Sequence, residues 1–302
     1  HTVLAARLGA YRVAIRDYAG RIAEPESAVV ATAAELTAAG RTPVPWNEIV
    51  TSSGAIPYTP ERRLTWLPAR VLGAEQAVWV PAALALPMSA ANRDGYAERT
   101  VAGATAAPTV DEVTADGLAG AIAYDGLQAV MRGRASLVEL SEADLISDDD
   151  MALMVKAAHR FGQRVRAFTV PAAAPVVLAV SEPADQGRPL WTVGAATTAR
   201  QALHSAVRDL VGLMQVRHFE GIEADLGLPL LADFDPRTAL AASSGTGAPA
   251  LPAELTVAEI LTALTARGLT AVQVDITPSD IRSSRAMSVG VVLLWRRDPA
   301  AN

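Results

Sequence analysis

The sequence has no cysteine and a single lysine, Lys156, among its 26 basic residues. Without cysteine the chain can form neither disulfides nor thiolate zinc sites, and it has no cysteine nucleophile. A phosphate-binding loop ending in Gly-Lys-Ser or Gly-Lys-Thr is excluded too, because Lys156 follows a valine. Several common redox, metal and nucleotide sites are therefore ruled out from the start.

Long apolar runs and an excess of positive charge are also missing. No run reaches the roughly 18 apolar residues of a membrane-spanning helix, and no charged-then-apolar leader opens the chain. The net charge of −6 argues against nucleic acid as the main ligand. We therefore expect a cytoplasmic protein with no nucleic-acid and no membrane partner. The near-exclusive use of arginine over lysine is typical of GC-rich bacteria.

With 302 residues and 51% apolar content, the chain can bury a large hydrophobic core. Helical and alternating patterns mix along the chain, which predicts an α/β (α+β mixed) fold with mixed β-sheets packed by helices. We expect a single domain over residues 1–302, with a loop or linker at 241–252. Because the chain begins with His1 rather than methionine, we expect it to be either a trimmed chain or a segment of a longer polypeptide.

A helix that begins at Asp111-Glu112 and extends past residue 125 is predicted at the centre of the chain, since its apolar residues recur at three and four. Its glycines 117, 120 and 126 would each cost about 1 kcal/mol relative to alanine, which indicates either close packing against another element or collapse of a vacated pocket. Pro68 and Pro81 should confine their strands to edges or bulges. Other helices are predicted at 4–18 with Gly20 as C-cap, at 151–161, at 198–215 and between Thr256 and Gly268, and strands at 64–71, 77–86, 164–170, 175–181, 272–276 and 288–295.

Metal-binding patterns are weak. The histidines lack ligand spacing, and His204 and His218 have the character of ordinary surface or half-buried residues. The run 148–150 consists of three aspartates. It could bind a divalent ion, but acidic residues at a helix N-terminus are the favoured interpretation.

Several short segments, weak one by one, resemble the YcaO family in their order and spacing, and this likeness extends over almost the whole chain. The best-known members are ATP-dependent cyclodehydratases that form thiazoline and oxazoline rings in ribosomally made peptides. The matching segments are Leu64-Thr65-Trp66, Val78-Trp79-Val80-Pro81-Ala82, Gly103-Ala104-Thr105, Asp111-Glu112-Val113, Gly194-Ala195-Ala196, Ala202-Leu203, Ala206-Val207 with Asp209, and Arg267-Gly268-Leu269 through Val274-Asp275-Ile276-Thr277-Pro278-Ser279-Asp280.

The resemblance also implies where a nucleotide site would lie. In active members three helices present glutamates at i and i+3 to magnesium ions and the nucleotide phosphates, and that spacing places both carboxylates on one helix face. The matching positions here are Val13, Arg16 and Asp17 on the first helix, Gly120, Ala123, Tyr124 and Asp125 on the central helix, and Asp209 and Gly212 on the third.

These positions predict a degenerate site with no catalytic residue, no metal ligand and no ATP or magnesium cofactor. Magnesium needs oxygen ligands, which valine, glycine and alanine side chains lack, and the added charge of Arg16 cannot replace several metal contacts. Tyr124 would then fill the space of the nucleotide. A shifted helix register is the alternative, since it would let Asp17, Glu112, Asp116 and Asp125 retain ATP and magnesium.

Three functions remain under consideration. The first is a non-catalytic scaffold or binding subunit of a bacterial assembly that makes thiazole- or oxazole-type peptides. Its partners would be a modifying enzyme, the precursor peptide, or a second copy in a homodimer. The second is an active ATP-dependent cyclodehydratase that forms azoline rings in a precursor peptide. The third is an unrelated α/β binding protein.

Overall fold

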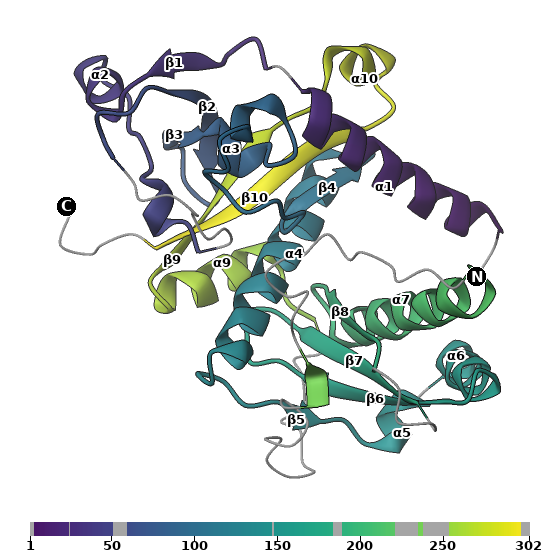
Figure 1. Cartoon of the computed structure of the whole chain (residues 1–302). Coiled ribbons are helices and arrows are strands. Elements are labelled where there is room, and N and C mark those ends of the chain that lie inside the picture. The colour runs from purple at the N-terminus through teal and green to yellow at the C-terminus, as the bar shows by residue number, and fades with distance from the viewer. Residues whose placement is uncertain are drawn as a thin grey trace. The chain divides into compact units, whose positions relative to one another are not determined.

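The structure is a computed structural model that describes residues 3–23, 25–50, 59–146, 148–183, 189–220, 235–237 and 254–296. The chain divides into two compact units (Figure 1), unit 1 being His1–Ala121 with Val257–Asn302 and unit 2 being Ile122–Thr256. The division falls within helix α4 (Val110–Met131). The predicted loop at 241–252 lies outside the described residues, and the single domain stays a prediction.

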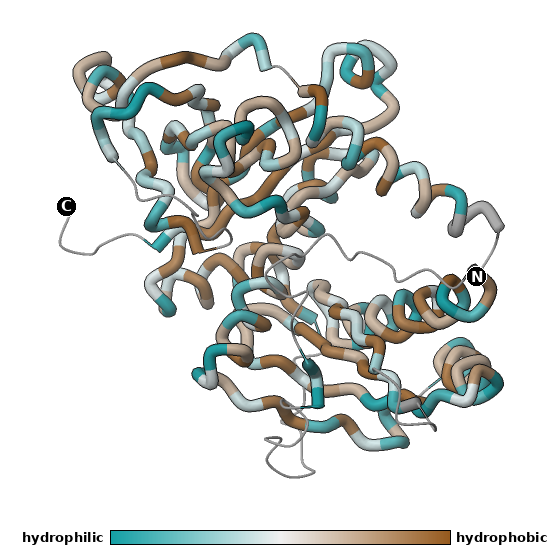
Figure 2. Tube along the Cα trace, in the orientation of Figure 1, coloured by the Kyte–Doolittle hydropathy of each residue, from teal (hydrophilic) through white to brown (hydrophobic). Residues whose placement is uncertain are grey.

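Unit 1 is built around a six-stranded antiparallel sheet of order β1-β2-β9-β10-β4, with β3 paired to β2. The sheet residues on β9 and β10 are almost all buried, which accounts for their near-continuous apolar sequences in Figure 2. Its strands are β1 (Val29–Ala31), β2 (Leu64–Val71), β3 (Ala77–Pro81), β4 (Ala104–Ala107), β9 (Leu269–Asp275) and β10 (Ser288–Arg296).

Helices cover this sheet and connect its strands. They are α1 (Val3–Ile22), α2 (Ala33–Ala38), α3 (Ala82–Ala85), the first part of α4, α9 (Val257–Ala266) and α10 (Ser279–Ser284), with 3-10 turns η1 (Trp46–Glu48) and η2 (Ala90–Asn92). Two buried indoles fix distant segments: Trp66 Nε1 donates to the carbonyl of Ala31 at 2.9 Å, and Trp295 Nε1 donates to Glu48 Oε2 at 2.7 Å.

Helix α4 begins where the sequence predicts, and two of its glycines lie at points of close packing. A Cβ on Gly117 would lie 2.9 Å from the carbonyl oxygen of Gly103 and 2.9 Å from Val292 Cγ2. Gly103 itself has φ +73° and its missing side chain lets it contact the carbonyl of Val292. The helix can therefore approach β10 and the turn before β4 closely, as predicted. The predicted packing also holds for Gly126, where a Cβ would lie 3.0 Å from Val170 Cγ1.

Unit 2 is a four-stranded antiparallel sheet of order β5-β6-β7-β8 with helices packed on it. The apolar side of α7 predicted from the sequence is buried at all its positions except Leu213, which is partly exposed. The elements are β5 (Val138–Glu139), α5 (Glu142–Leu145), α6 (Asp149–Arg160), β6 (Gln163–Thr169), β7 (Val176–Pro183), β8 (Trp191–Ala195) and α7 (Ala199–Glu220).

The predicted fold class is confirmed, and the named strands of both sheets pair antiparallel throughout. Three local predictions were wrong. Gly20 lies inside α1, which continues to Ile22, and the strand predicted over 77–86 ends at Pro81, where α3 begins. Pro68 does not confine its strand to a sheet edge. Within the described residues, no helix is both long enough and apolar enough to span a membrane.

Pro68 is tolerated inside the sheet for a geometric reason. Its strand β2 is not an edge strand, because β3 pairs along one side and β1 and β9 pair along the other. On that second side, however, β1 pairs with Leu64–Trp66 and β9 pairs only with Arg70 and Val71. Pro68 therefore falls in the gap between the two partners, where a missing N–H costs little.

Candidate functional site

The first predicted site positions lie on α1, in unit 1. Val13 is 48% exposed. The Arg16 guanidinium is bound by its neighbour Asp17, with Nη2 2.7 Å and Nε 2.8 Å from Oδ1. The charge gained at Arg16 is therefore compensated locally by the one carboxylate that this helix retains.

Ion pairs from Arg12, next to Val13, connect α1 to the first two turns of α4. Arg12 Nη2 lies 2.9 Å from Glu112 Oε2, and Arg12 Nη1 lies 3.7 Å from Asp116 Oδ2. Desolvation raises the pKa of Asp116, Arg12 opposes this shift, and Glu112 adds to it. The side chain of Asp116 is still 54% exposed, so water screens these interactions and its carboxylate is accessible.

The positions on α4 are mostly apolar and buried. Ala123 is 4% exposed, and Tyr124, at 1%, is among the largest fully buried side chains. A Cβ on Gly120 would lie 3.5 Å from the backbone nitrogen of Gly103, which is ordinary contact, so this position can accept a side chain. Asp125 is partly exposed. The burial of Tyr124 agrees with the packing role expected for it.

Of the positions on α7, in unit 2, Asp209 is exposed and Gly212 is partly exposed. Asp209 Oδ1 is 2.9 Å from Nη2 of its neighbour Arg208, with both side chains about half exposed. A Cβ on Gly212 would have no atom within 4 Å. Val13, Arg16, Asp17 and Gly120 thus belong to unit 1, and Ala123, Tyr124, Asp125, Asp209 and Gly212 belong to unit 2.

The aspartate run at 148–150 lies at the N-terminus of helix α6, which confirms the interpretation favoured from the sequence. Asp148 is the N-cap of α6: its Oδ1 accepts from the backbone N–H of Met151 at 2.9 Å, and its Oδ2 lies 2.9 Å from Arg200 Nη2. The hydrogen bond from Met151 is the main reason that the pKa of Asp148 is lowered, and Arg200 contributes further. Across the described part of the chain, no three His, Asp or Glu side chains gather in a way that could hold a metal ion.

A pocket of about 580 Å³ in unit 1 was not predicted from the sequence. It is lined by residues of β2, β9 and β10, the first turn of α4, and α10 with the segment after it; its charged residues are Arg70, Asp275, Arg282 and Arg285. A weak sequence signal existed in Gln273, a polar residue within the apolar run of β9. The sequence alone could not show that Gln273 meets Arg70.

The chain matches the family described as YcaO cyclodehydratase, ATP- and Mg2+-binding, over residues 1–291. It belongs to the YcaO family. The predicted resemblance is confirmed, and the hypothesis of an unrelated α/β binding protein was wrong. No curated protein matches the chain.

Solved structures share the fold at low sequence identity. A heterocyclase in complex with substrate and cofactor has a TM-score of 0.73 and 17% identity, covering 95% of this chain and 42% of its own. YcaO from Methanopyrus kandleri bound with AMPPCP and Mg2+ has a TM-score of 0.71 and 18% identity, with 96% and 75% coverage. The E. coli microcin synthetase McbBCD complex gives 0.64 and 13%, with 97% and 79% coverage. This YcaO chain thus spans less than half the length of the heterocyclase.

In the predicted register, the residues of this YcaO chain do not fit a magnesium-nucleotide site. Val13, Gly120, Ala123 and Gly212 offer no side-chain oxygen, and the side chains of Asp17 and Asp209 are already paired with adjacent arginines. Magnesium demands near-octahedral oxygen coordination. The described residues contain no group of three His, Asp or Glu side chains that could hold a metal ion. This absence does not test the cofactor prediction, because one or two carboxylates plus phosphates are enough for magnesium.

Proposed function

We propose that this chain is a non-catalytic YcaO protein of a peptide-modifying assembly of the thiazole- or oxazole-forming type. It would act as a scaffold that binds the precursor peptide or the modifying enzyme, without ATP or magnesium. The observation that carries the proposal is the set of side chains at the predicted ligand positions, where oxygen ligands are replaced by valine, glycine and alanine.

Two further observations support the proposal. Tyr124 is 1% exposed, so its phenol ring is part of the packed interior rather than a group that contacts a bound nucleotide. Arg16 is held by Asp17 at 2.7 Å, so an adjacent carboxylate already compensates its charge and weakens its attraction for a phosphate.

The molecules bound in structures with a similar fold favour peptide and protein partners for this chain. One solved relative is described as a heterocyclase with its substrate, and another is a microcin synthetase complex of several chains. A precursor peptide, a partner enzyme and a second copy of this chain are therefore the partners to test. Co-purification with a candidate precursor peptide or a candidate modifying enzyme tests the first two, and light scattering of the isolated chain tests the homodimer.

Calorimetric titration of ATP, with and without magnesium, tests the loss of the nucleotide site. We expect no magnesium-dependent heat for the natural protein at ATP concentrations up to about 1 mM, where a typical nucleotide site would be saturated. The companion variant is Gly120→Glu with Ala123→Glu, which places carboxylates at both family positions. Gly9→Glu is the matched control, since a Cβ there has no atom within 4 Å. Micromolar, magnesium-dependent binding by the natural protein would contradict the proposal.

An active ATP-dependent cyclodehydratase is the second candidate, and family membership together with the exposed carboxylate of Asp116 favours it. It predicts ATP-dependent loss of one water mass from a precursor peptide in a reconstituted mixture. Asp116→Asn should abolish that activity if a shifted register brings this carboxylate to the metal. Arg12→Gln is the comparison, since it removes the ion pair while leaving the carboxylate.

A further inference from the structure

The unit 1 pocket carries more positive than negative charge. Among the described residues that line it, three are arginines and one, Asp275, is acidic. Asp275 is already engaged: Oδ1 accepts from the backbone N–H of Thr277 at 2.9 Å, and Oδ2 lies 3.1 Å from Arg282 Nη2. Two of the three guanidinium charges therefore have no carboxylate partner within the pocket lining.

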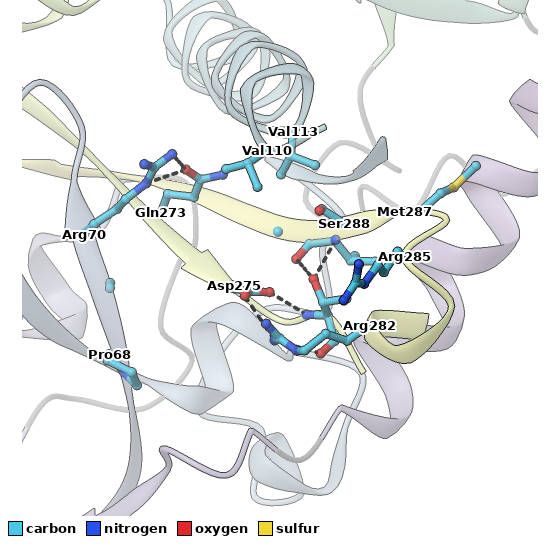
Figure 3. A pocket seen from close by; sticks show the side chains of 14 residues that line it. Pro68, Arg70, Val110, Val113, Gln273, Asp275, Arg282, Arg285, Met287 and Ser288 are labelled. Carbon is cyan, nitrogen blue, oxygen red and sulfur yellow. Dashed lines mark hydrogen bonds and ion pairs between the residues drawn. The ribbon is translucent and has the colours of Figure 1, made fainter. Parts of the chain in front are cut away.

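Arg70 is held by neutral groups at one end of the pocket (Figure 3). Its Nη2 and Nε donate to Gln273 Oε1 at 2.6 and 2.9 Å, and Nη2 lies 3.0 Å from Thr114 Oγ1. These contacts fix the direction of the guanidinium without neutralising it. The Nη1 amino group makes no hydrogen bond to any described residue.

The same contacts fix the orientation of the Gln273 amide. Its oxygen must face Arg70, because the opposite orientation would place an NH2 group against a guanidinium. Gln273 is 6% exposed, and its Nε2 has no hydrogen-bond partner among the residues that the structure describes. A buried donor without a partner costs about 1 to 3 kcal/mol. Gly290 packs closely beside this group, since a Cβ there would lie 3.4 Å from Nε2 and 2.7 Å from Val113 Cγ1.

Arg285 stands at the opposite end of the pocket from Arg70 (Figure 3). It has φ +52°, a left-handed conformation that is unfavourable for an arginine, and it ends α10. Its side chain is exposed and has no ion-pair or hydrogen-bond partner in the described part of the chain. Val110 and Val113 form an apolar wall between the charged ends, and Met287 lies at the Arg285 end.

We propose that this pocket binds a carboxylate carried on an apolar chain. Gln273 Nε2 would donate a hydrogen bond to the carboxylate, Arg70 and Arg285 would add positive charge at the two ends, and the valine wall would contact the apolar part of the ligand. The proposal is independent of the loss of the nucleotide site, because it uses none of the predicted ATP positions.

Four probes distinguish the sources of such a carboxylate in calorimetric titrations. Acetyl-Ala-Val-Ala-Glu-amide carries it on a side chain, acetyl-Ala-Val-Ala-Gln with a free C-terminus carries it on the backbone, and hexanoate is a small acid. Acetyl-Ala-Val-Ala-Gln-amide has no carboxylate. We expect at least one acid to bind about tenfold or more tightly than the amide, and the strongest acid identifies the source. Equal binding of all four probes, or no binding of any, would overturn the proposal.

Gln273→Glu is the decisive variant because it removes the free donor and places a carboxylate against Arg70 at nearly unchanged shape. The new ion pair should preserve the fold, which thermal unfolding checks, while acid binding falls about tenfold or more. Arg285→Gln should weaken binding as well. Arg267→Gln is the matched control, since it removes an exposed arginine of the same unit that does not line the pocket. Unchanged acid binding in folded Gln273→Glu protein would refute the assignment of this site.

Discussion

Gly194 lies where strand β8 passes directly beneath helix α7. A Cβ at this residue would contact the carbonyl oxygen of Ala202 and would lie 2.6 Å from the backbone nitrogen of Ala206. The helix cannot easily retreat, because Thr192 Oγ1 donates to the carbonyl of Ala206 at 2.6 Å. We expect Gly194→Ala to lower the free energy of unfolding by about 3 kcal/mol, measured by urea denaturation.

Gly212→Ala is the matched control on the same helix. A Cβ at Gly212 has no atom within 4 Å, and α7 continues on both sides of it. Alanine should therefore stabilise the protein by about 0.5 to 1 kcal/mol. If Gly212→Ala destabilised the protein instead, the surface of α7 at this predicted site position would have to be packed against a partner element.

Residue identities predicted single positions well when the cause was local. The cap at Asp148 follows from an aspartate before a helical pattern, and the turn at Gly268, with φ +71°, follows from a glycine after one. The pocket could not be predicted in this way. Gln273 and Arg70 are 203 positions apart in the sequence. Their contact can be recognised only once the pairing of β2 with β9 is known.

At the scale of elements, Arg166 links three strands of the unit 2 sheet. It makes two contacts to Glu139 on β5 and one to Glu182 on β7, each at 2.7 Å. Hydrogen bonds from Arg166 are the largest cause of the lowered pKa of Glu139, which desolvation opposes. A lowered folded-state pKa means that this stabilisation is present above the unfolded value, about 4.3, and is lost as the pH falls through the folded value.

We therefore expect Arg166→Gln to lower the free energy of unfolding by about 1 to 2 kcal/mol at pH 7, with a smaller effect at pH 3, where a larger fraction of Glu139 is protonated. Denaturation curves at the two pH values measure this difference. Arg63→Gln is the comparison, because Arg63 and Glu35 are half exposed and their ion pair should contribute little. An equal loss at both pH values would show that Arg166 acts through packing, such as its contact with the Phe168 ring.

Long periodic elements were predicted and short ones were missed for a physical reason. Helices α4, α6 and α7 and the hairpin of β6 and β7 repeat their pattern often enough to be read from the sequence. Strands β4 and β8 were not predicted, because β4 is only four residues long and Gly194 interrupts β8. In both cases the sheet partner decides the structure: β10 pairs with β4, and β7 pairs with β8.

At the scale of the whole molecule, family and fold class followed from the order of many weak motifs, none of which is diagnostic alone. Function depends on a different kind of information, namely which side chains occupy a few positions. A fold can be kept while those positions change, because the core residues that specify the fold, such as Trp66 and Leu118, are separate from the polar groups that perform chemistry. Confirmation of the YcaO fold therefore leaves the activity to experiment.

Thermal unfolding tests the whole chain for any nucleotide that its folded state binds. A ligand present at 100 times its Kd stabilises the native state by about 2.7 kcal/mol, which corresponds to roughly 5 °C or more in Tm for a chain of this size. We expect ADP, ATP and AMPPCP, each at millimolar concentration with magnesium, to shift Tm by less than about 1 °C. Magnesium alone is the control for non-specific ion effects. AMPPCP cannot transfer its γ-phosphoryl group, so a clear shift in Tm with this analogue would mean that a nucleotide site persists. Asp116 and Asp125 should then be mutated first to locate that site.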